Sequence, residues 1–165
     1  MDKTGMTTRT WKPLATVGAD AVLLALACLI PAASHALALP LYKLNPMLAL
    51  MLAGMVAGKD WRNGLLLAVL LPAVSWLAVG MPTAAKAVCM AAELATVAAV
   101  FGGLQRKWSP MTAVLAAAVA GKGVYYLLKA LLLPTAPLVG TEWWLQAGAV
   151  VLWGGLFALI YRRPR

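Results

Sequence analysis

The sequence predicts an all-α integral membrane protein, with one domain over residues 1–165 in which six transmembrane helices form a single bundle. Composition is the first observation behind this. Of the 165 residues, 63% are hydrophobic and only 12% are charged, whereas about 25% of the residues of a typical soluble domain are charged. The second observation is that apolar runs of roughly the 20 residues needed to cross a bilayer recur along the whole chain. The third is that Lys and Arg gather in alternate joints between these runs.

The predicted spans begin and end at residues typical of helix ends. They cover residues 14–39, 44–58, 64–79, 83–104, 111–133 and 143–161. The joints contain Asn45-Pro46, Gly80 and Ser109-Pro110, which are helix-terminating or turn-forming residues. Pro31 and Pro72 lie within the first and third spans, so these helices are expected to be tilted or broken and covered by neighbours. The N-terminus has the outline of a secretory signal, but its long apolar run favours a retained first helix.

The distribution of basic residues predicts the orientation. Ten of the 14 Lys and Arg residues fall on one side of the membrane: Lys3, Arg9, Lys12, Lys59, Arg62, Arg106, Lys107, Arg162, Arg163 and Arg165. Lys43 is the one cation in the opposite loops. Because cytoplasmic loops collect Lys and Arg, both termini are expected to be cytoplasmic, which requires an even number of spans. The net charge of +9 then needs no nucleic-acid partner.

The three lysines that remain after the loop cations, Lys86, Lys122 and Lys129, fall inside the predicted spans, together with Glu93. A charge at the bilayer centre costs about 2.5 to 3.5 kcal/mol on insertion scales, so such groups usually face the bundle interior or a cavity. Lys86 and Glu93 are seven residues apart and therefore share a helix face. These residues indicate a functional site inside the bundle.

The fifth span has a polar stripe, because Lys122, Tyr125, Tyr126 and Lys129 follow the i, i+3, i+4, i+7 spacing of one helix face. The predicted orientation puts Lys129 in the outer half of the membrane and Lys122 near the middle, so this stripe and the Lys86–Glu93 face overlap in the outer leaflet. Further residues at the same depth can join them: His35, Tyr42, Asn45, Ser75, Trp76, Trp143, Trp144 and Gln146. We expect a polar and aromatic pocket that opens outward and binds an anionic group.

A packing role would explain some of the same residues. In that interpretation a buried Lys-Glu pair fixes the helices, Lys129 extends to the surface, and the aromatic residues form an interfacial belt. His35 taken alone is more often a hydrogen-bonded structural residue. Three lysines against one Glu93 leave positive charge that a single pair does not explain, which favours an anion site.

Signatures of catalysis, cofactor binding and metal binding are lacking. Gly58-Lys59 and Gly121-Lys122 do not fit a phosphate-binding loop, which requires an earlier Gly and a following Ser or Thr. With one His, the sequence offers no metal cluster and no plausible Ser/His/Asp set. Cys28 and Cys89 lie far apart within apolar runs and are interpreted as packing residues. The sequence therefore predicts a protein that is not an enzyme.

Four stretches together resemble a known family. They are residues 40–47 (Pro-Leu-Tyr-Lys-Leu-Asn-Pro-Met), Pro72 with residues 80–82, residues 86–94, and residues 121–129. Over almost its whole length the chain resembles the substrate-binding S component of energy-coupling factor transporters, small six-helix proteins that capture vitamins and other micronutrients in the bacterial cytoplasmic membrane.

The resemblance implies a pocket near the extracellular face, built from the fourth to sixth helices and the outer loops. It also implies docking on a transmembrane coupling protein driven by two ATPases, through small residues of the first helix. Ala15, Ala19, Ala21 and Ala25 match that pattern, although helix packing alone also produces small residues four apart. The substrate is expected to be an anionic micronutrient of unspecified identity.

Two other functions are compatible with the sequence. The chain is also similar to a six-helix scaffold protein of the cell-shape and wall-elongation machinery, which would have partners in wall synthesis. A small intramembrane enzyme or an ion-coupled carrier, with Glu93 as a proton site, has less support because it rests on one carboxylate.

Overall fold

The computed structural model describes residues 14–38, 41–135 and 143–161, except for the side chains of His35 and Tyr42. Within these residues all regular structure is helical, which confirms the predicted all-α class for the described part of the chain. Each α-helix begins and ends within three residues of its predicted span. The elements are α1 (Leu14–Ala36), the 3-10 helix η1 (Leu41–Leu44), α2 (Pro46–Gly58), α3 (Trp61–Val79), α4 (Ala84–Leu104), α5 (Pro110–Leu132) and α6 (Trp143–Ile160).

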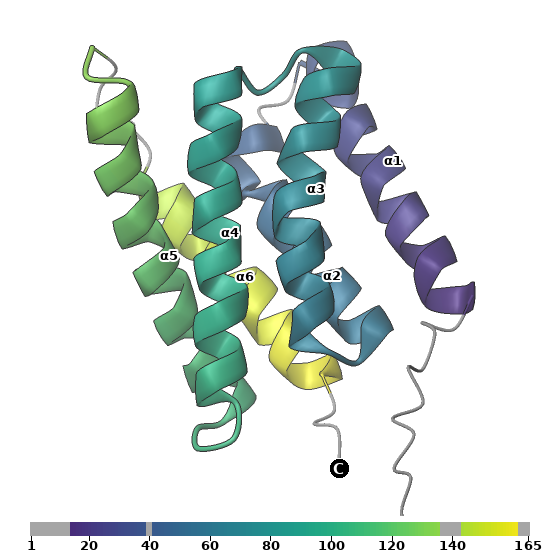
Figure 1. The fold of residues 1–165 in the computed structure, drawn as a ribbon, viewed down its shortest axis with the longest axis vertical. Coiled ribbons are helices and arrows are strands. Elements are labelled where there is room, and N and C mark those ends of the chain that lie inside the picture. The colour runs from purple at the N-terminus through teal and green to yellow at the C-terminus, as the bar shows by residue number, and fades with distance from the viewer. Residues whose placement is uncertain (1–13, 39–40, 136–142, 162–165) are drawn as a thin grey trace, which may run out of the picture.

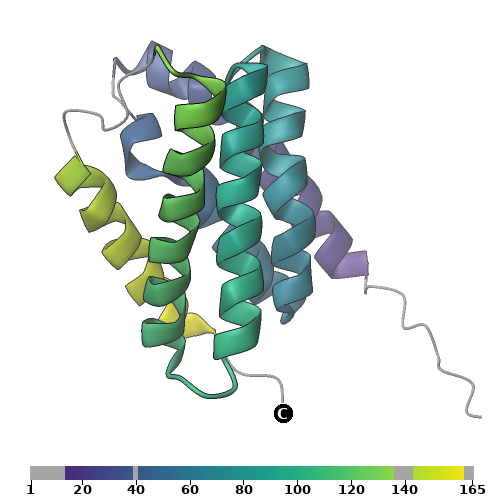
Figure 2. The ribbon, with the colours of Figure 1, turned by 60° about the vertical axis from the view of Figure 1, so that its left-hand side comes forward.

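The helices form one bundle in which α5, α4, α3 and α1 stand side by side and α2 and α6 lie behind them (Figure 1). Figure 2 shows α6 crossing behind α5 at a steep angle. Successive helices alternate in direction, so the start of α1 and the end of α6 lie at the same end of the bundle. We call this the basic end, because its α2–α3 and α4–α5 connections bring Lys59, Arg62, Arg106 and Lys107 there.

Among the described residues, five helices are long and apolar enough to cross a membrane: α1, α3, α4, α5 and α6. They support a multi-pass membrane protein. Helix α2 is different, because its 13 residues extend only about 20 Å at 1.5 Å per residue, less than the hydrocarbon core of about 30 Å. Met47, Leu48, Met51, Leu52 and Met55 of α2 are all buried. Helix α2 therefore packs mainly against protein.

Helix α3 departs most clearly from its predicted limits. It begins at Trp61 and not at Gly64, because the Asp60 side chain accepts a hydrogen bond of 3.0 Å from the Arg62 backbone N–H and so caps the helix. The prediction took Gly58 to Gly64 as one break. Pro31 and Pro72 lie inside continuous α1 and α3, so of the two predicted outcomes, a tilted or a broken helix, the break is not found.

Asp20, a buried carboxylate, joins α1 to the rest of the bundle. It was not among the predicted site residues. Asp20 lies within the first predicted span and is 9% exposed. The Asn63 Nδ2 atom donates to Asp20 Oδ1 at 2.8 Å and to the Gly54 carbonyl at 2.9 Å. One amide thus ties α1, α2 and α3 together in the half of the bundle nearer the basic end.

Gly121 sets how closely α5 approaches α4. A Cβ atom at this position would lie 2.6 Å from Val97 Cγ2 and 2.9 Å from the Glu93 carbonyl oxygen. The second of these neighbours is backbone, so a side chain at residue 121 must push the two helices apart. Gly123, on the same helix, would meet nothing within 4 Å.

Replacing Gly121 with Ala is therefore expected to destabilise the protein by about 1–3 kcal/mol, the usual cost of overpacking a core. Thermal unfolding in detergent measures the effect. Gly123→Ala is the matched control, since it makes the same change on the same helix without a clash. Equal melting temperatures for the two variants would show that the close α4–α5 approach is wrong.

Candidate functional site

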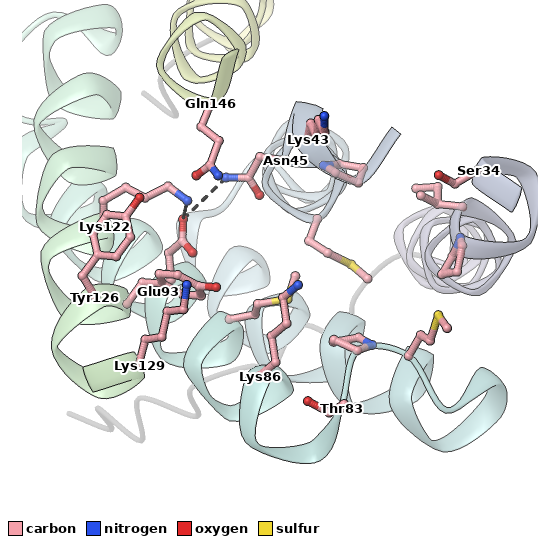
Figure 3. Close-up of a pocket in the computed structure, with 18 of the residues that line it drawn as sticks. Ser34, Lys43, Asn45, Thr83, Lys86, Glu93, Lys122, Tyr126, Lys129 and Gln146 are labelled. Atoms are coloured by element: carbon pink, nitrogen blue, oxygen red, sulfur yellow. Dashed lines mark hydrogen bonds and ion pairs between the residues drawn. The ribbon is translucent and has the colours of Figure 1, made fainter. Parts of the chain in front are cut away.

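A pocket of about 750 Å³ lies in the bundle toward the end opposite the basic end. It is enclosed by the end of α1, η1, the start of α2, the α3–α4 turn, α4, α5 and the start of α6. Figure 3 shows polar side chains from these separate elements converging on it. The polar lining residues are Ser34, Lys43, Asn45, Thr83, Lys86, Glu93, Lys122, Tyr125, Tyr126, Lys129 and Gln146.

An ion pair between α4 and α5 lies at the centre of this group. Lys122 Nζ is 2.8 Å from Glu93 Oε1, and the two side chains are 22% and 6% exposed. Glu93 lies on α4, and Lys122 directly follows Gly121 on α5, where α5 approaches α4 closely. The close helix approach therefore brings the two charged groups into contact.

Asn45 reaches the same carboxylate from the first loop. Its Nδ2 atom is 3.5 Å from Glu93 Oε1, a long contact at the limit of a hydrogen bond. Asn45 has left-handed backbone geometry, with φ 49° and ψ 56°, which Asn tolerates better than most residues. It precedes Pro46, the first residue of α2, and its side chain does not cap that helix. The side chain is instead directed into the pocket (Figure 3).

Two tyrosines form an aromatic wall beside the ion pair. The rings of Tyr125 and Tyr126 meet edge to face, with centroids 5.5 Å apart. Lys122 Nζ lies 5.1 Å from the centroid of the Tyr125 ring, within range of a cation–π interaction. The predicted stripe on α5 thus faces the pocket over its full length.

Hydrogen bonds from the side chains of Trp153 and Ser75 hold the pocket's borders in place. Trp153 Nε1 on α6 donates to the Leu44 carbonyl of η1 at 2.7 Å. The Ser75 hydroxyl lies 2.7 Å from the Met81 carbonyl and 3.3 Å from the Ala27 carbonyl. Ser75 was predicted to join the pocket, but it supports the α3–α4 turn from behind and does not line it.

The described lining carries four lysines and one carboxylate: Lys43, Lys86, Lys122, Lys129 and Glu93. Lys43 was counted in the sequence analysis as a loop cation only. In the structure Lys43 lines the pocket, because η1 lies over it. Lys122 is paired with Glu93. Four lysines against one carboxylate give the described lining more positive than negative charge, as the anion hypothesis requires.

Most of the predicted site residues are brought together. Asn45, Lys86, Glu93, Lys122, Tyr125, Tyr126, Lys129 and Gln146 all line the one pocket. The side chains of His35 and Tyr42 lie outside the described part of the structure. Trp76, Trp143 and Trp144 are at least 41% exposed and are not among the lining residues. The pocket wall formed by Ile30, Pro31, Met81 and Pro82 was not predicted, because apolar residues carry no signal that separates a pocket wall from ordinary packing.

The small residues of α1 fall on two different sides of the helix. Ala15 and Ala21 are six residues apart, which places them about 120° apart around the axis at 3.6 residues per turn. Ala15, Ala21 and Ala25 are exposed in the bundle and Ala19 is half-buried. Ala21 and Ala25, four residues apart, form the more accessible of the two predicted pairs.

Comparison of the chain with protein-family models, with curated proteins and with solved structures finds no match. The pocket's own residues are therefore the basis for assigning a function.

Proposed function

We propose that this chain is the substrate-capture subunit of a micronutrient uptake transporter, in which a separate coupling module with two ATPases supplies the energy. The observation that carries the proposal is the polar, net positive pocket around Glu93 within an otherwise apolar bundle. Its volume of about 750 Å³ lies in the range of about 300–1,000 Å³ found for small-molecule sites. Buried ionisable groups in membrane proteins generally mark such sites.

The proposed role is binding and release without chemical change, so no residue is assigned a catalytic step. The sequence resemblance to S components of energy-coupling factor transporters supports the same role, because it also implies a pocket near the extracellular face. In this proposal the protein lies in a bacterial cytoplasmic membrane, α2 counts as the sixth span, and the basic end faces the cytoplasm. The pocket then opens toward the outside, where a nutrient is captured.

The orientation can be tested by labelling single cysteines in intact cells, in a background in which Cys28 and Cys89 are replaced by Ala. A cysteine at Lys59, in the α2–α3 connection, should react with a membrane-impermeant maleimide only after the cells are lysed. A cysteine at Thr135, just beyond α5, should react in intact cells. The reverse pattern would put the pocket on the cytoplasmic side and contradict a capture role.

A membrane scaffold is the second candidate, and the Lys122–Glu93 ion pair favours it. A closed pair that joins α4 to α5 is what a purely structural role needs. The two roles differ in their partners, because a scaffold should bind wall-synthesis proteins.

Affinity purification of the full chain from its native membrane, in mild detergent, separates these functions. A transmembrane coupling protein together with two ATPase subunits is the expected set of partners. Wall-synthesis enzymes without ATPases would contradict the capture role and support the scaffold.

A further inference from the structure

The floor of the pocket has hydrogen-bonding capacity that the described residues do not use. Glu93 is buried, and among the described residues only Lys122 and Asn45 contact its carboxylate, both at Oε1. A carboxylate offers about four lone-pair positions and an ammonium group three donors. The Gln146 amide also lines the pocket without a hydrogen bond from the described residues. Buried polar groups are normally satisfied, so the unused capacity of the buried Glu93 carboxylate points to a ligand.

The arrangement of this capacity indicates what the ligand presents. Glu93 Oε1 and Lys122 Nζ are 2.8 Å apart, so an acceptor and a donor stand side by side. An N–H group next to a C=O group, as in a lactam, a cyclic urea or a pyrimidinone, offers the complementary pair at a similar spacing. Because the two protein charges offset each other, a neutral edge of this kind is favoured over a cation. Tyr125 and Tyr126 provide an aromatic wall for a flat ring beside the pair.

A second recognition point lies nearer the mouth. Lys86 also lines the pocket, is exposed, and makes no ion pair within the described residues. It lies seven residues before Glu93 on α4, or about 10 Å along the helix axis at 1.5 Å per residue. Thr83, the N-cap residue of α4, lines the same part of the pocket as Lys86. An anionic group of the ligand would meet Lys86 there.

We propose that the substrate is an elongated organic acid. A ring with an N–H/C=O edge binds the Glu93–Lys122 pair at the pocket floor, and a carboxylate or phosphate about 10 Å away binds Lys86 at the mouth. The proposal rests on the capture role and defines the class of compound captured. It assigns Lys122 to the neutral head of the substrate, whereas the sequence indicated that Lys86, Lys122 and Lys129 together hold the anion.

Three matched probes test this proposal by isothermal titration calorimetry on the full chain in detergent. They are 6-(5-carboxypentyl)uracil, its methyl ester, and its N1,N3-dimethyl derivative. The free acid is expected to bind, and both the ester and the dimethyl derivative should bind at least tenfold more weakly. Equal affinity of the acid and the ester, equal affinity of the acid and the dimethyl derivative, or no binding of the acid would overturn the proposal. Tighter binding of 6-(5-aminopentyl)uracil than of the acid would do the same.

Variants locate the two recognition points. Lys86→Gln should remove the difference between acid and ester while the difference between acid and dimethyl derivative remains. Lys86 is exposed, so this variant does not threaten folding. Lys107→Gln, at the basic end, is the charge-matched control and should change neither difference. A Lys86→Gln protein that still prefers the acid tenfold would show that the anion binds elsewhere.

The capture role is judged separately, by the partners that co-purify with the chain. If the coupling protein and ATPases are present but the acid fails to bind, the substrate class is wrong and the capture role stands. If the partners are absent as well, both fail.

Discussion

Replacing Lys122 with Met is expected to weaken binding of the captured compound at least tenfold, which corresponds to about 1.4 kcal/mol, and to lower the melting temperature. Met keeps the length of the side chain but removes the ammonium group that lies 2.8 Å from Glu93 Oε1. Removing one partner of a buried ion pair costs about 3–5 kcal/mol, because the other charge stays buried alone. The 22% exposure of the Lys122 side chain places the expected loss at the lower end of that range.

The double variant Lys122→Met/Glu93→Leu separates binding from stability. It removes both charges, so no unpaired charge is left and much of the lost stability should return. Binding should stay weak, because the acceptor and donor pair is gone. Calorimetry and melting temperature measured on the same preparation decide the outcome. Unchanged affinity in the single variant, with only stability reduced, would mean that the pair serves packing alone.

Replacing Ala25 with Trp is expected to abolish uptake in cells while binding by the purified protein stays within about twofold of the wild type, well under the tenfold that corresponds to 1.4 kcal/mol. Ala25 is exposed on α1 and does not line the pocket. Small residues four apart let a second helix approach closely, and a bulky side chain prevents that approach. Ala21 lies on the same side of α1, so Ala21→Trp should behave in the same way.

Leu159→Trp is the control for this effect, because Leu159 is 85% exposed on α6 and takes a bulky side chain at the surface without touching the proposed docking side. Uptake should survive in this variant. If Ala25→Trp loses binding and uptake together, Ala25 contributes to the fold of α1 and not to a partner surface.

The sequence predicted the helices well because their apolar runs and joints are local features. It also predicted the stripe on α5, since Lys122, Tyr125, Tyr126 and Lys129 share a face whatever the helix packs against. It did not predict which lysine pairs with Glu93. Glu93 shares a helix face with Lys86 but contacts Lys122 on the neighbouring helix, because the missing side chain at Gly121 lets α5 come close.

Other features depend on contacts between distant segments. Lys43 lines the pocket because η1 lies over it. The hydrogen bond from Trp153 to the Leu44 carbonyl, 109 residues apart in the sequence, holds η1 there. Asp20 was overlooked although it is a charged residue within a predicted span, the same signal that drew attention to Glu93. Its partner Asn63 lies 43 residues away, in a stretch that was taken for a loop. Applying the intramembrane-charge rule to every span would have found it.

The central claim, that the pocket captures a small molecule, is tested most directly by mass spectrometry of the compounds retained by the gently purified full chain. We expect one micronutrient-sized anion at close to one molecule per protein, and expect it to be lost in the Lys122→Met variant but retained in Leu159→Trp. A wild-type protein that retains only lipid and detergent, with the pocket empty in every preparation, would contradict the claim.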